Sequence, residues 1–451
     1  MISDIQNISI KPFSKECNSR VKMPGSKSIS NRALILSVMC KGDVELQHIL
    51  ESEDVSLMQE ALTDLGVCIT KTKNGVIVKG TGGEIPNQKS TINVGNAGTI
   101  ARFLTCLLAS QSGAEYFMDG AEAMRNRPML ELLSCLEKLG AKIEYREKKG
   151  HFPFKLKCNG LYGNNIRIDA RKSGQNISGL IMQSPRLGNK CNIIFTEGTV
   201  SMPFIDMTLK MIGEFNENKS YTYDLLSHSL RVNNCAYKKE SFVYKIEPDA
   251  TAASYFLTLP LVVGGECFVE GLKADMLQGD IAYCDILKSL GGRIEYNADG
   301  VKSIFHNTLN GGTFNFVDIS DTFLTLAAIS PLLGSNLEIY GIEHTRKQET
   351  DRVSAMATEL KKLGQDVTEK PDRLIITPDL NKLRKLAEHG VSIDTYNDHR
   401  FAMSFAILGS FDLYGSGKSW LTINNPLCCS KTFPDFFDRL NTARDNSNVE
   451  K

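Results

Sequence analysis

Cationic side chains follow glycine- or serine-rich loops at several points along this chain of 451 residues. The first such stretch, Gly25–Arg32, reads GSKSISNR and runs into the apolar sequence ALIL. Serine is a good helix cap, and the first turn of a helix offers unpaired N–H groups and a partial positive charge. Lys27 and Arg32 add full charges, so the stretch suits a phosphate or carboxylate, although a capped helix with two solvated cations has the same sequence pattern. It is not a P-loop, because that motif needs glycine where the chain has Arg20.

Later loop-to-helix junctions repeat this design. Asn96 and Gly98 open a second expected helix, where glycine permits close approach of a ligand to the backbone. Arginine forks match carboxylate and phosphate groups through two parallel hydrogen bonds. Taken singly, each cation is more readily explained as a solvated surface group. Taken together, the cations at four more junctions favour an anion site: Arg127, Arg352, Arg400 and Lys431.

Two carboxylates lie near these cations in the sequence. Glu349 belongs to the run RKQETDR at 346–352, which also fits an exposed helix start held by ion pairs. In the functional interpretation, cationic neighbours adjust Glu349 for acid–base chemistry. Asp321 lies at an expected helix start, where a carboxylate often serves only as a cap. The full set indicates two small anionic substrates and proton transfer, without a metal or an organic cofactor.

The overall composition limits the other classes of function. Apolar residues make up 42% and charged residues 23%, as in a globular enzyme, and a formal net charge of zero argues against nucleic acid or an anionic membrane as partner. The first residues lack the apolar core of a secretory signal, and no apolar run reaches the length of a membrane span. The twelve cysteines show no metal-ligand spacing, so we expect them to be reduced and buried in a cytoplasmic protein.

A helix that ends in a Leu-Gly or Ile-Gly pair recurs about every 75 residues. The pairs are Leu65-Gly66, Leu139-Gly140, Ile212-Gly213, Leu290-Gly291 and Leu363-Gly364. Each unit also opens with a strand, a polar or glycine loop and a helix rich in small residues, which predicts a βαβαββ repeat. A sixth helix, over 433–440, is expected to close the series, and the polar tail after Leu440 is expected to be disordered. Six repeats in a chain of this length predict two domains of three repeats.

These motifs, taken in order, resemble those of the 5-enolpyruvylshikimate-3-phosphate (EPSP) synthase family. The resemblance runs from Pro24 to Leu440 and rests on GSKSISNRAL, GNAGT, the Arg127-Pro128 pair, QETDR, YNDHR and KTFPDFF. It implies an α/β fold of the inside-out barrel type, with six βαβαββ repeats in two domains. Domain I would comprise 1–24 and 246–451 with repeats four to six, and domain II would comprise 25–245 with repeats one to three. The active site would lie in the cleft between them.

The resemblance also implies the reaction. The enolpyruvyl group of phosphoenolpyruvate would pass to the 5-hydroxyl of shikimate 3-phosphate, giving 5-enolpyruvylshikimate 3-phosphate and phosphate in the shikimate pathway, which leads to chorismate and the aromatic amino acids. The enzyme would be a cytoplasmic monomer that needs no cofactor or metal and binds neither nucleic acid nor membrane.

Residue roles follow from the matched motifs. The implied catalytic residues are Asp321, Glu349 and Lys27. Phosphoenolpyruvate would be bound by Lys27, Asn96, Gly98, Arg127, Gln175, Arg352, Arg400 and Lys431. Shikimate 3-phosphate would be bound by Lys27, Ser28, Arg32, Ser173, Gly174, Gln175, Ser201, Asp321, His344 and Gln348.

Four positions depart from the usual family pattern. Gly174 stands where a second serine is usual, Met202 and Gln348 where lysines are frequent, and His344 where others carry asparagine. Arg346 or Lys347 could supply the charge missing at Gln348. A UDP-N-acetylglucosamine enolpyruvyl transferase and a non-catalytic sensor of a phosphorylated ligand remain alternatives.

Overall fold

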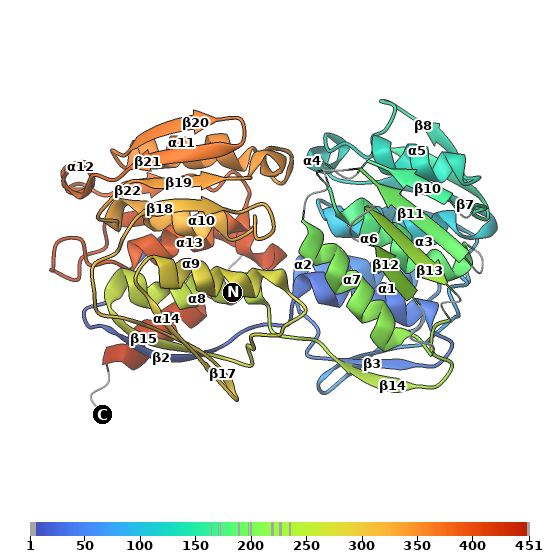
Figure 1. Cartoon of the computed structure of the whole chain (residues 1–451), viewed down its shortest axis with the longest axis horizontal. Coiled ribbons are helices and arrows are strands. Elements are labelled where there is room, and N and C mark those ends of the chain that lie inside the picture. Colours follow the sequence, from blue (N-terminus) through green and yellow to red (C-terminus); the bar gives the residue numbers. More distant parts are fainter. Residues whose placement is uncertain are drawn as a thin grey trace. The chain divides into compact units, whose positions relative to one another are not determined.

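The chain forms two compact units. In the computed structural model, unit 1 comprises Met1–Pro24 and Pro248–Lys451, and unit 2 comprises Gly25–Glu247 (Figure 1). The structure describes residues 6–448 except 164, 170, 172, 188–189, 197, 199–200, 218–220, 225–227 and 234–235.

Unit 2 contains three four-stranded sheets within its described residues, and all three share one strand arrangement. In each sheet the first two strands pair in parallel and the next two pairs are antiparallel. The first sheet has the order β14 (Phe242–Lys245), β3 (Val44–Gln47), β5 (Gly75–Val78), β4 (Ile69–Thr72). The second has the order β6 (Lys89–Asn93), β7 (Ser112–Asp119), β9 (Phe154–Asn159), β8 (Lys142–Tyr145). The third has the order β10 (Asn165–Ile168), β11 (Lys190–Phe195), β13 (Ser229–Asn233), β12 (Tyr221–Asp224).

Unit 1 has two four-stranded sheets and one of three strands within the described part of the chain. Each again combines one parallel pair with antiparallel pairing. Their orders are β16 (Arg293–Asn297), β17 (Gly300–Phe305), β15 (Gly265–Glu270), β2 (Cys17–Lys22); then β18 (Gly312–Asn315), β19 (Leu337–Tyr340), β21 (Arg373–Thr377), β20 (Asp366–Lys370); and β1 (Asn7–Ser9), β23 (Leu421–Asn424), β22 (Val391–Ile393).

Two strands belong to a different unit from the helix that follows them. Strand β2 immediately precedes the first helix of unit 2 yet pairs with β15 of unit 1, with Val21 opposite Val269. Strand β14 precedes the first long helix of unit 1 yet pairs with β3 of unit 2, with Tyr244 opposite Leu46. The chain therefore crosses between the units twice, at Pro24 and near Pro248.

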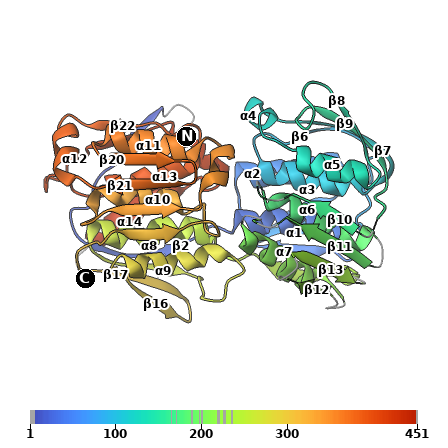
Figure 2. The same cartoon turned by 45° about the horizontal axis from the view of Figure 1, so that its top comes forward.

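The helices of each unit fall into two kinds. Those of the first kind are buried on nearly every side, which suits their small and apolar composition. They are α1 (Lys27–Met39), α3 (Gly98–Ala109) and α6 (Gln175–Met182) in unit 2, and α8 (Ala250–Val263), α10 (Phe323–Ile329) and α13 (His399–Gly409) in unit 1 (Figure 2). In both units the buried helices pack against one another.

The second kind have one buried face and one solvated face. They are α2 (Glu53–Asp64), α5 (Leu130–Lys138), α7 (Met202–Phe215), α9 (Tyr283–Ser289), α11 (Arg352–Lys362) and α14 (Phe436–Asn448). The short helices are α4 (Glu122–Arg125), α12 (Leu380–Leu386), η1 (Ser184–Arg186), η2 (Gly279–Ala282), η3 (Ser330–Leu332), η4 (Glu343–Lys347) and η5 (Pro426–Lys431).

The predicted glycine caps are confirmed at four of the five pairs. Helices α2, α5, α9 and α11 each have leucine as the cap residue, followed by glycine with a positive φ. The prediction is wrong at Ile212-Gly213, because α7 continues through both residues to Phe215. The apolar residues of the extra turn explain this, since Ile212 and Phe215 are both buried.

The C-terminal tail also differs from its prediction. We expected disorder after Leu440, but α14 continues to Asn448. Its last turns dock on β2, where Ser19 Oγ donates to the carbonyl of Ala443 at 2.6 Å and Asn18 N donates to Ser447 Oγ at 2.9 Å. The small side chains of Ala443 and Ser447 let the helix approach the strand closely, and these hydrogen bonds satisfy polar groups of both elements.

Two further expectations concern membranes and thiols. Among the described residues, no helix has the length and apolar content needed to cross a membrane.

The eleven described cysteines are free thiols, and nine of them are buried. Cys68 is exposed and Cys428 is half-buried, so the prediction of burial is wrong at these two positions, while Cys235 lies outside the described residues.

Candidate active site

Arg352 is the central residue of a charged cluster in unit 1. It is the first residue of α11, its side chain is only 1% exposed, and three carboxylates surround it. Its Nε donates to Asp398 Oδ2 at 2.7 Å, Nη1 to Asp321 Oδ1 at 2.8 Å and Nη2 to Glu349 Oε2 at 2.9 Å. Gln348 Oε1 accepts a further hydrogen bond from Nη1. The buried guanidinium thus joins the segments that precede α10, α11 and α13.

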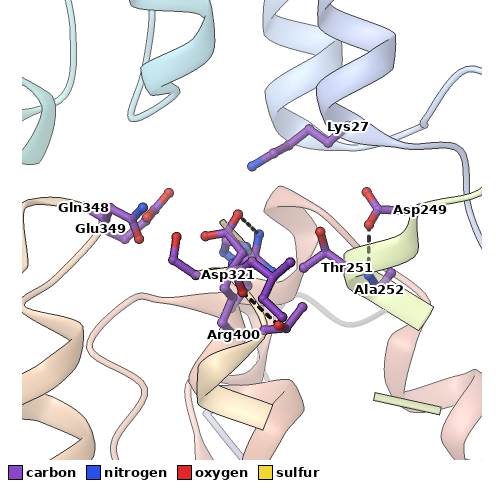
Figure 3. Close-up of polar contacts among 12 residues, drawn as sticks. Lys27, Asp249, Thr251, Ala252, Asp321, Gln348, Glu349 and Arg400 are labelled. Carbon is purple, nitrogen blue, oxygen red and sulfur yellow. Dashed lines mark hydrogen bonds and ion pairs between the residues drawn. The ribbon is translucent and has the colours of Figure 1, made fainter. Parts of the chain in front are cut away.

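Each of two carboxylates in the cluster lies between two cations. Asp321 accepts from Arg352 through Oδ1 and from Arg400 Nη2 through Oδ2, the latter at 2.7 Å (Figure 3). Glu349 accepts from Arg352 through Oε2 and from Lys431 Nζ through Oε1, the latter at 3.0 Å. The order Lys431, Glu349, Arg352, Asp321, Arg400 therefore alternates cation and carboxylate along one continuous network.

Burial and charge act in opposite directions on the two arginines of this network. Burial alone would lower the pKa of Arg352, but the carboxylates of Asp398, Glu349 and Asp321 outweigh it and raise that pKa above its usual value. Arg400 behaves likewise: burial lowers its pKa, but Asp321, Tyr255 and Asp398 together raise that pKa above its usual value. Both side chains stay cationic at any ordinary pH, and the carboxylates hold them in place.

Two of the four residues that depart from the usual family pattern, His344 and Gln348, lie in or beside this cluster. His344 shares a 2.8 Å hydrogen bond between its Nε2 and Ser320 Oγ, next to Asp321. Burial lowers the pKa of His344 to about 4, so the ring is neutral near pH 7. Gln348 accepts from Arg352, as described above.

The two cations proposed to replace a lysine at Gln348 differ in their surroundings. Arg346 donates to Asp351, to Glu369 and to the carbonyls of Lys370 and Pro371 at 2.8–3.1 Å, so its guanidinium is engaged by β20 and the residue after it as well as by its own segment. Lys347 is exposed. Of the two, Lys347 is the better candidate for supplying charge to a ligand.

In unit 2, Lys27 opens α1 as predicted. Ser26 caps the helix, and Lys27 Nζ lies 3.3 Å from Asp54 Oδ2 at the start of α2. Asp54 is buried, so it holds the lysine amine near the first turn of α1.

Arg32, one turn further along α1, is bound within the protein. It donates to Thr208 Oγ1 at 2.7 Å, to Ser178 Oγ at 3.2 Å and to the carbonyls of Ser28 and Phe204. Burial lowers the pKa of Arg32 to about 9. The structure thus places Arg32 and Ser28 together and links α1 with α6 and α7, while their predicted contact with shikimate 3-phosphate stays a prediction.

Gly98 is the first residue of α3 and lies directly under an arginine. A Cβ added at Gly98 would meet Arg127 Nη2 at 2.7 Å and Arg102 Nη1 at 2.9 Å. Arg102 donates to the carbonyl of Gly98 at 3.0 Å, whereas the buried Nε and Nη1 of Arg127 have no hydrogen-bond partner among the described residues. The structure brings Gly98 and Arg127 together as predicted, close to Asn96, and leaves Arg127 with donors for a ligand.

The remaining predicted residues lie at two further helix starts in unit 2. Ser173 and Gly174 precede α6, and Gln175 is its first residue. Ser201 immediately precedes α7 with a φ of 60°, and Met202 begins that helix. Helices α6 and α7 pack against each other, and Ser178 Oγ in the first turns of α6 donates to the carbonyl of Phe204 in the first turn of α7 at 3.4 Å.

Three residues close to these sites had no predicted role. Asp398 lies within the YNDHR motif, two residues before Arg400, and its membership of that motif is the signal that could have identified it. Asp54 and the buried Asp280 stand in ordinary acidic helix starts, and such a pattern does not indicate their partners.

A two-unit α/β protein whose helix starts carry alternating cations and carboxylates can bind small, multiply charged anions and move protons beside them. The family model described as EPSP synthase (3-phosphoshikimate 1-carboxyvinyltransferase) matches residues 13–440, and the chain belongs to that family.

Relatives and solved structures agree with this membership. The 3-phosphoshikimate 1-carboxyvinyltransferase of Opitutus terrae is 42% identical over 443 residues, covering 97% of each chain, and that of a Marinomonas species is 36% identical, covering 97% of this chain and 99% of its own. The structure of EPSP synthase from Acinetobacter baumannii matches with a TM-score of 0.76 at 23% identity, covering 97% and 98% of the two chains. The enolpyruvyl transferase NikO from Streptomyces tendae has the same fold, with a TM-score of 0.70 at 13% identity and coverage of 97% of each chain.

Proposed function

We propose that the chain transfers the enolpyruvyl group of phosphoenolpyruvate to the 5-hydroxyl of shikimate 3-phosphate and releases inorganic phosphate. The observation that carries this proposal is the placement of Asp321 and Glu349, each between two cations. A site that only binds anions gains nothing from two carboxylates among its cations. A site that must both bind anions and transfer protons needs both kinds of group.

The chemistry has two steps, addition and elimination. In the addition, Asp321 takes the proton of the 5-hydroxyl as its oxygen bonds to C2 of phosphoenolpyruvate, and Glu349 delivers a proton to C3, which turns the methylene into a methyl group. In the elimination, a proton leaves that methyl group, the C2–C3 double bond forms again and the C2–O bond to phosphate breaks. One proton is added to C3 and one is removed, so no oxidant or reductant is needed.

The cations have separate roles in this scheme. Arg352, Arg400 and Lys431 bind the carboxylate and phosphate of phosphoenolpyruvate. Arg352 already holds both acid–base groups in position, while Arg400 holds Asp321 and Lys431 holds Glu349. Binding of the anions loosens these ion pairs and frees Asp321 and Glu349 for proton transfer. The carboxylates thereby compensate the cations until the substrates arrive.

Side chains of unit 2 complete the binding of both substrates. Phosphoenolpyruvate is also bound by Lys27, Asn96, Gly98, Arg127 and Gln175. Shikimate 3-phosphate is bound by Lys27, Ser28, Arg32, Ser173, Gly174, Gln175 and Ser201 of unit 2 and by Asp321, His344 and Gln348 of unit 1. Six βαβαββ repeats, three in each of the two domains, form the inside-out barrels. The enzyme acts as a cytoplasmic monomer.

Phosphate release tests the proposal directly. Purified protein is mixed with phosphoenolpyruvate and shikimate 3-phosphate without added metal, and a parallel reaction contains UDP-N-acetylglucosamine as the acceptor. We expect release only with shikimate 3-phosphate, and its loss in Asp321→Ala and Glu349→Ala. Release only with the nucleotide sugar would overturn the acceptor. Binding of shikimate 3-phosphate without release in either reaction would overturn the enzyme assignment in favour of a sensor.

A further inference from the structure

Glu359 is a buried acid in α11, distinct from the groups that bind substrate or move protons in the proposed mechanism. Its side chain is 0% exposed, and both of its oxygens contact the segment 394–398, which connects β22 to α13. Oε1 accepts from the hydroxyl of Tyr396 at 2.5 Å, and Oε2 accepts from the backbone N of Asp394 at 3.2 Å. Lys362 Nζ, one turn further along α11, lies 2.9 Å from Oε1 and compensates the charge. A carboxylate is tolerated in the interior only when it is paired and hydrogen-bonded, so Glu359 and this segment depend on each other.

The segment has an unusual backbone conformation at Tyr396 and Asn397. Both residues are left-handed, with φ of 54° and 58°. Asparagine tolerates this region, whereas a bulky tyrosine adopts it only where surrounding contacts hold it there. The hydroxyl bond to Glu359 is one such contact, and the packing of the Tyr396 ring against Phe401, with centroids 5.6 Å apart, is another. The left-handed pair Tyr396-Asn397 is therefore held in place from α11.

Two members of the charged cluster follow directly after this left-handed pair. Asp398 accepts from Arg352 Nε at 2.7 Å and from the backbone N of Arg400 at 3.0 Å, so it joins Arg352 to the start of α13. Arg352 and Glu359 are seven residues apart on α11, which is about two helical turns, so they lie on one face of the helix. Helix α11 thus binds the segment 394–398 at two points, with the left-handed pair between them.

The left-handed pair also contacts the segment that leads to Lys431. Asn397 Oδ1 accepts from Asn425 Nδ2 at 2.7 Å, and Asn425 immediately precedes η5, which ends at Lys431. The conformation of 394–398 is therefore linked to the segments that carry two of the proposed substrate-binding cations, Arg400 and Lys431.

We propose that Glu359 is a positioning residue for phosphoenolpyruvate binding and that it acts through the hydroxyl of Tyr396. The hydrogen bond holds the left-handed pair, and the pair sets the positions of Asp398 and Arg400. Loss of the bond lets the segment relax toward ordinary backbone angles, which displaces Arg400 from the position in which it binds the substrate. This inference rests on the proposed function, because that function assigns Arg400 to phosphoenolpyruvate.

Tyr396→Phe is the smallest change that tests the inference, because it removes the hydroxyl and keeps the ring that packs against Phe401. We expect the KM for phosphoenolpyruvate to rise by about fivefold, the effect of one lost hydrogen bond, and the KM for shikimate 3-phosphate to change by less than about twofold. The matched control is Tyr414→Phe, which removes a 2.7 Å hydroxyl bond to the carbonyl of Arg384 elsewhere in unit 1 and should leave both constants unchanged. An unchanged KM for phosphoenolpyruvate in Tyr396→Phe, or an equal rise in both KM values, would overturn the proposal.

A pair of substitutions at Glu359 distinguishes positioning from general support of the fold. Glutamine can accept from Asp394 N through its oxygen and donate to the Tyr396 oxygen through its amide nitrogen, so it preserves both contacts. Glu359→Ala should raise the KM for phosphoenolpyruvate by about fivefold or more, and Glu359→Gln should restore most of that loss. Equal KM values in the two variants would contradict the proposal. If Glu359→Ala does not fold, the comparison of Tyr396→Phe with Tyr414→Phe decides.

A measurement of stability separates this inference from the proposed function. Urea unfolding of Tyr396→Phe, Arg352→Lys and the double variant forms a cycle that needs no substrate. Substitutions of residues with separate partners act independently, whereas the two ends of one held segment are coupled, so we expect the double variant to lose less stability than the sum of the single losses. Additive losses would overturn the inference whether or not the protein releases phosphate. A coupled cycle in a protein that releases no phosphate would support the positioning of the segment and contradict the proposed function alone.

Discussion

Arg352 donates from Nη1 to Asp321 Oδ1 at 2.8 Å, and this one bond joins the start of α11 to the segment before α10. The same guanidinium donates to Glu349 through Nη2, so the two proposed acid–base groups share one buried arginine. Any movement of Arg352 must therefore change the positions of both carboxylates. In the proposed mechanism, the alternation of cation and carboxylate couples binding to proton transfer within one unit of the chain.

Removal of the charge from Glu349 should abolish proton transfer with little effect on binding. For Glu349→Gln we expect kcat to fall by about 100-fold or more, the usual contribution of a general acid or base, with a smaller change in the KM for either substrate. Phosphate release at varied substrate concentration measures both constants. Glu343→Gln, on an exposed side chain in the preceding turn, is the control and should keep wild-type values. A large rise in KM with unchanged kcat would show that Glu349 only positions the arginines.

Replacement of Arg352 should affect stability as well as activity. Arg352→Lys keeps the charge but cannot contact Asp398, Asp321 and Glu349 at once, so some buried carboxylate oxygens lose their partner. We expect the free energy of unfolding to fall by about 3 kcal/mol, as when one partner of a buried ion pair is lost. Urea unfolding measures the loss, with the exposed Lys361→Ala on the same helix as control. Unchanged stability would mean that the cluster is held by packing alone.

The polar clusters were only partly predictable from sequence. Loop-to-helix junctions rich in glycine and serine located Lys27 and Gly98, and the charged run QETDR located Arg352, at the helix starts where the structure has them, because capping chemistry is local. The partners of these residues were not predictable. Asp54 and Asp280 contact or influence residues far away in the sequence, and an isolated aspartate in an acidic helix start gives no indication of such a partner.

The fold shows the same division between local and long-range information. The period of the Leu-Gly pairs correctly placed four helix ends, since a glycine with positive φ is a local requirement. The fifth pair was misjudged because burial of Phe215 extends α7 past Gly213. The pairing of β2 with β15 and of β14 with β3 joins strands about 250 and about 200 residues apart in the chain, and no local sequence pattern specifies it.

Alanine at Gly98 should weaken the binding of phosphoenolpyruvate. The new Cβ would lie 2.7 Å from Arg127 Nη2, so the arginine side chain must shift while the backbone stays in place. We expect the KM for phosphoenolpyruvate to rise by about tenfold, the effect of about 1.4 kcal/mol of lost binding, with a smaller change in the KM for shikimate 3-phosphate. Gly213→Ala, inside helix α7, is the matched control and should leave both constants unchanged. Equal rises in both KM values would contradict a specific effect on Arg127.

His344 should make the protein less stable in acid. Its pKa of about 4 in the folded state lies below the value of 6.5 expected for the unfolded chain. Between these values the unfolded chain binds a proton that the folded protein excludes, so the stability contributed by neutral His344 is present above about pH 6.5 and is lost as the pH falls toward 4. The loss is about 3 kcal/mol. Urea unfolding at several pH values should show a shallower acid decline for His344→Gln, and parallel curves would contradict the prediction.

The last turns of α14 should contribute to the stability of unit 1, contrary to the sequence expectation of a disordered tail. A chain shortened after Leu440 loses the bonds from Ser19 to Ala443 and from Asn18 to Ser447, together with a buried face of the helix. We expect the free energy of unfolding to fall by about 2 kcal/mol, since small buried contacts and two hydrogen bonds are removed. Thermal and urea unfolding measure the change, and Asn446→Ala on the exposed face of the same turns is the control. Wild-type stability in the shortened chain would show that the helix only rests on β2.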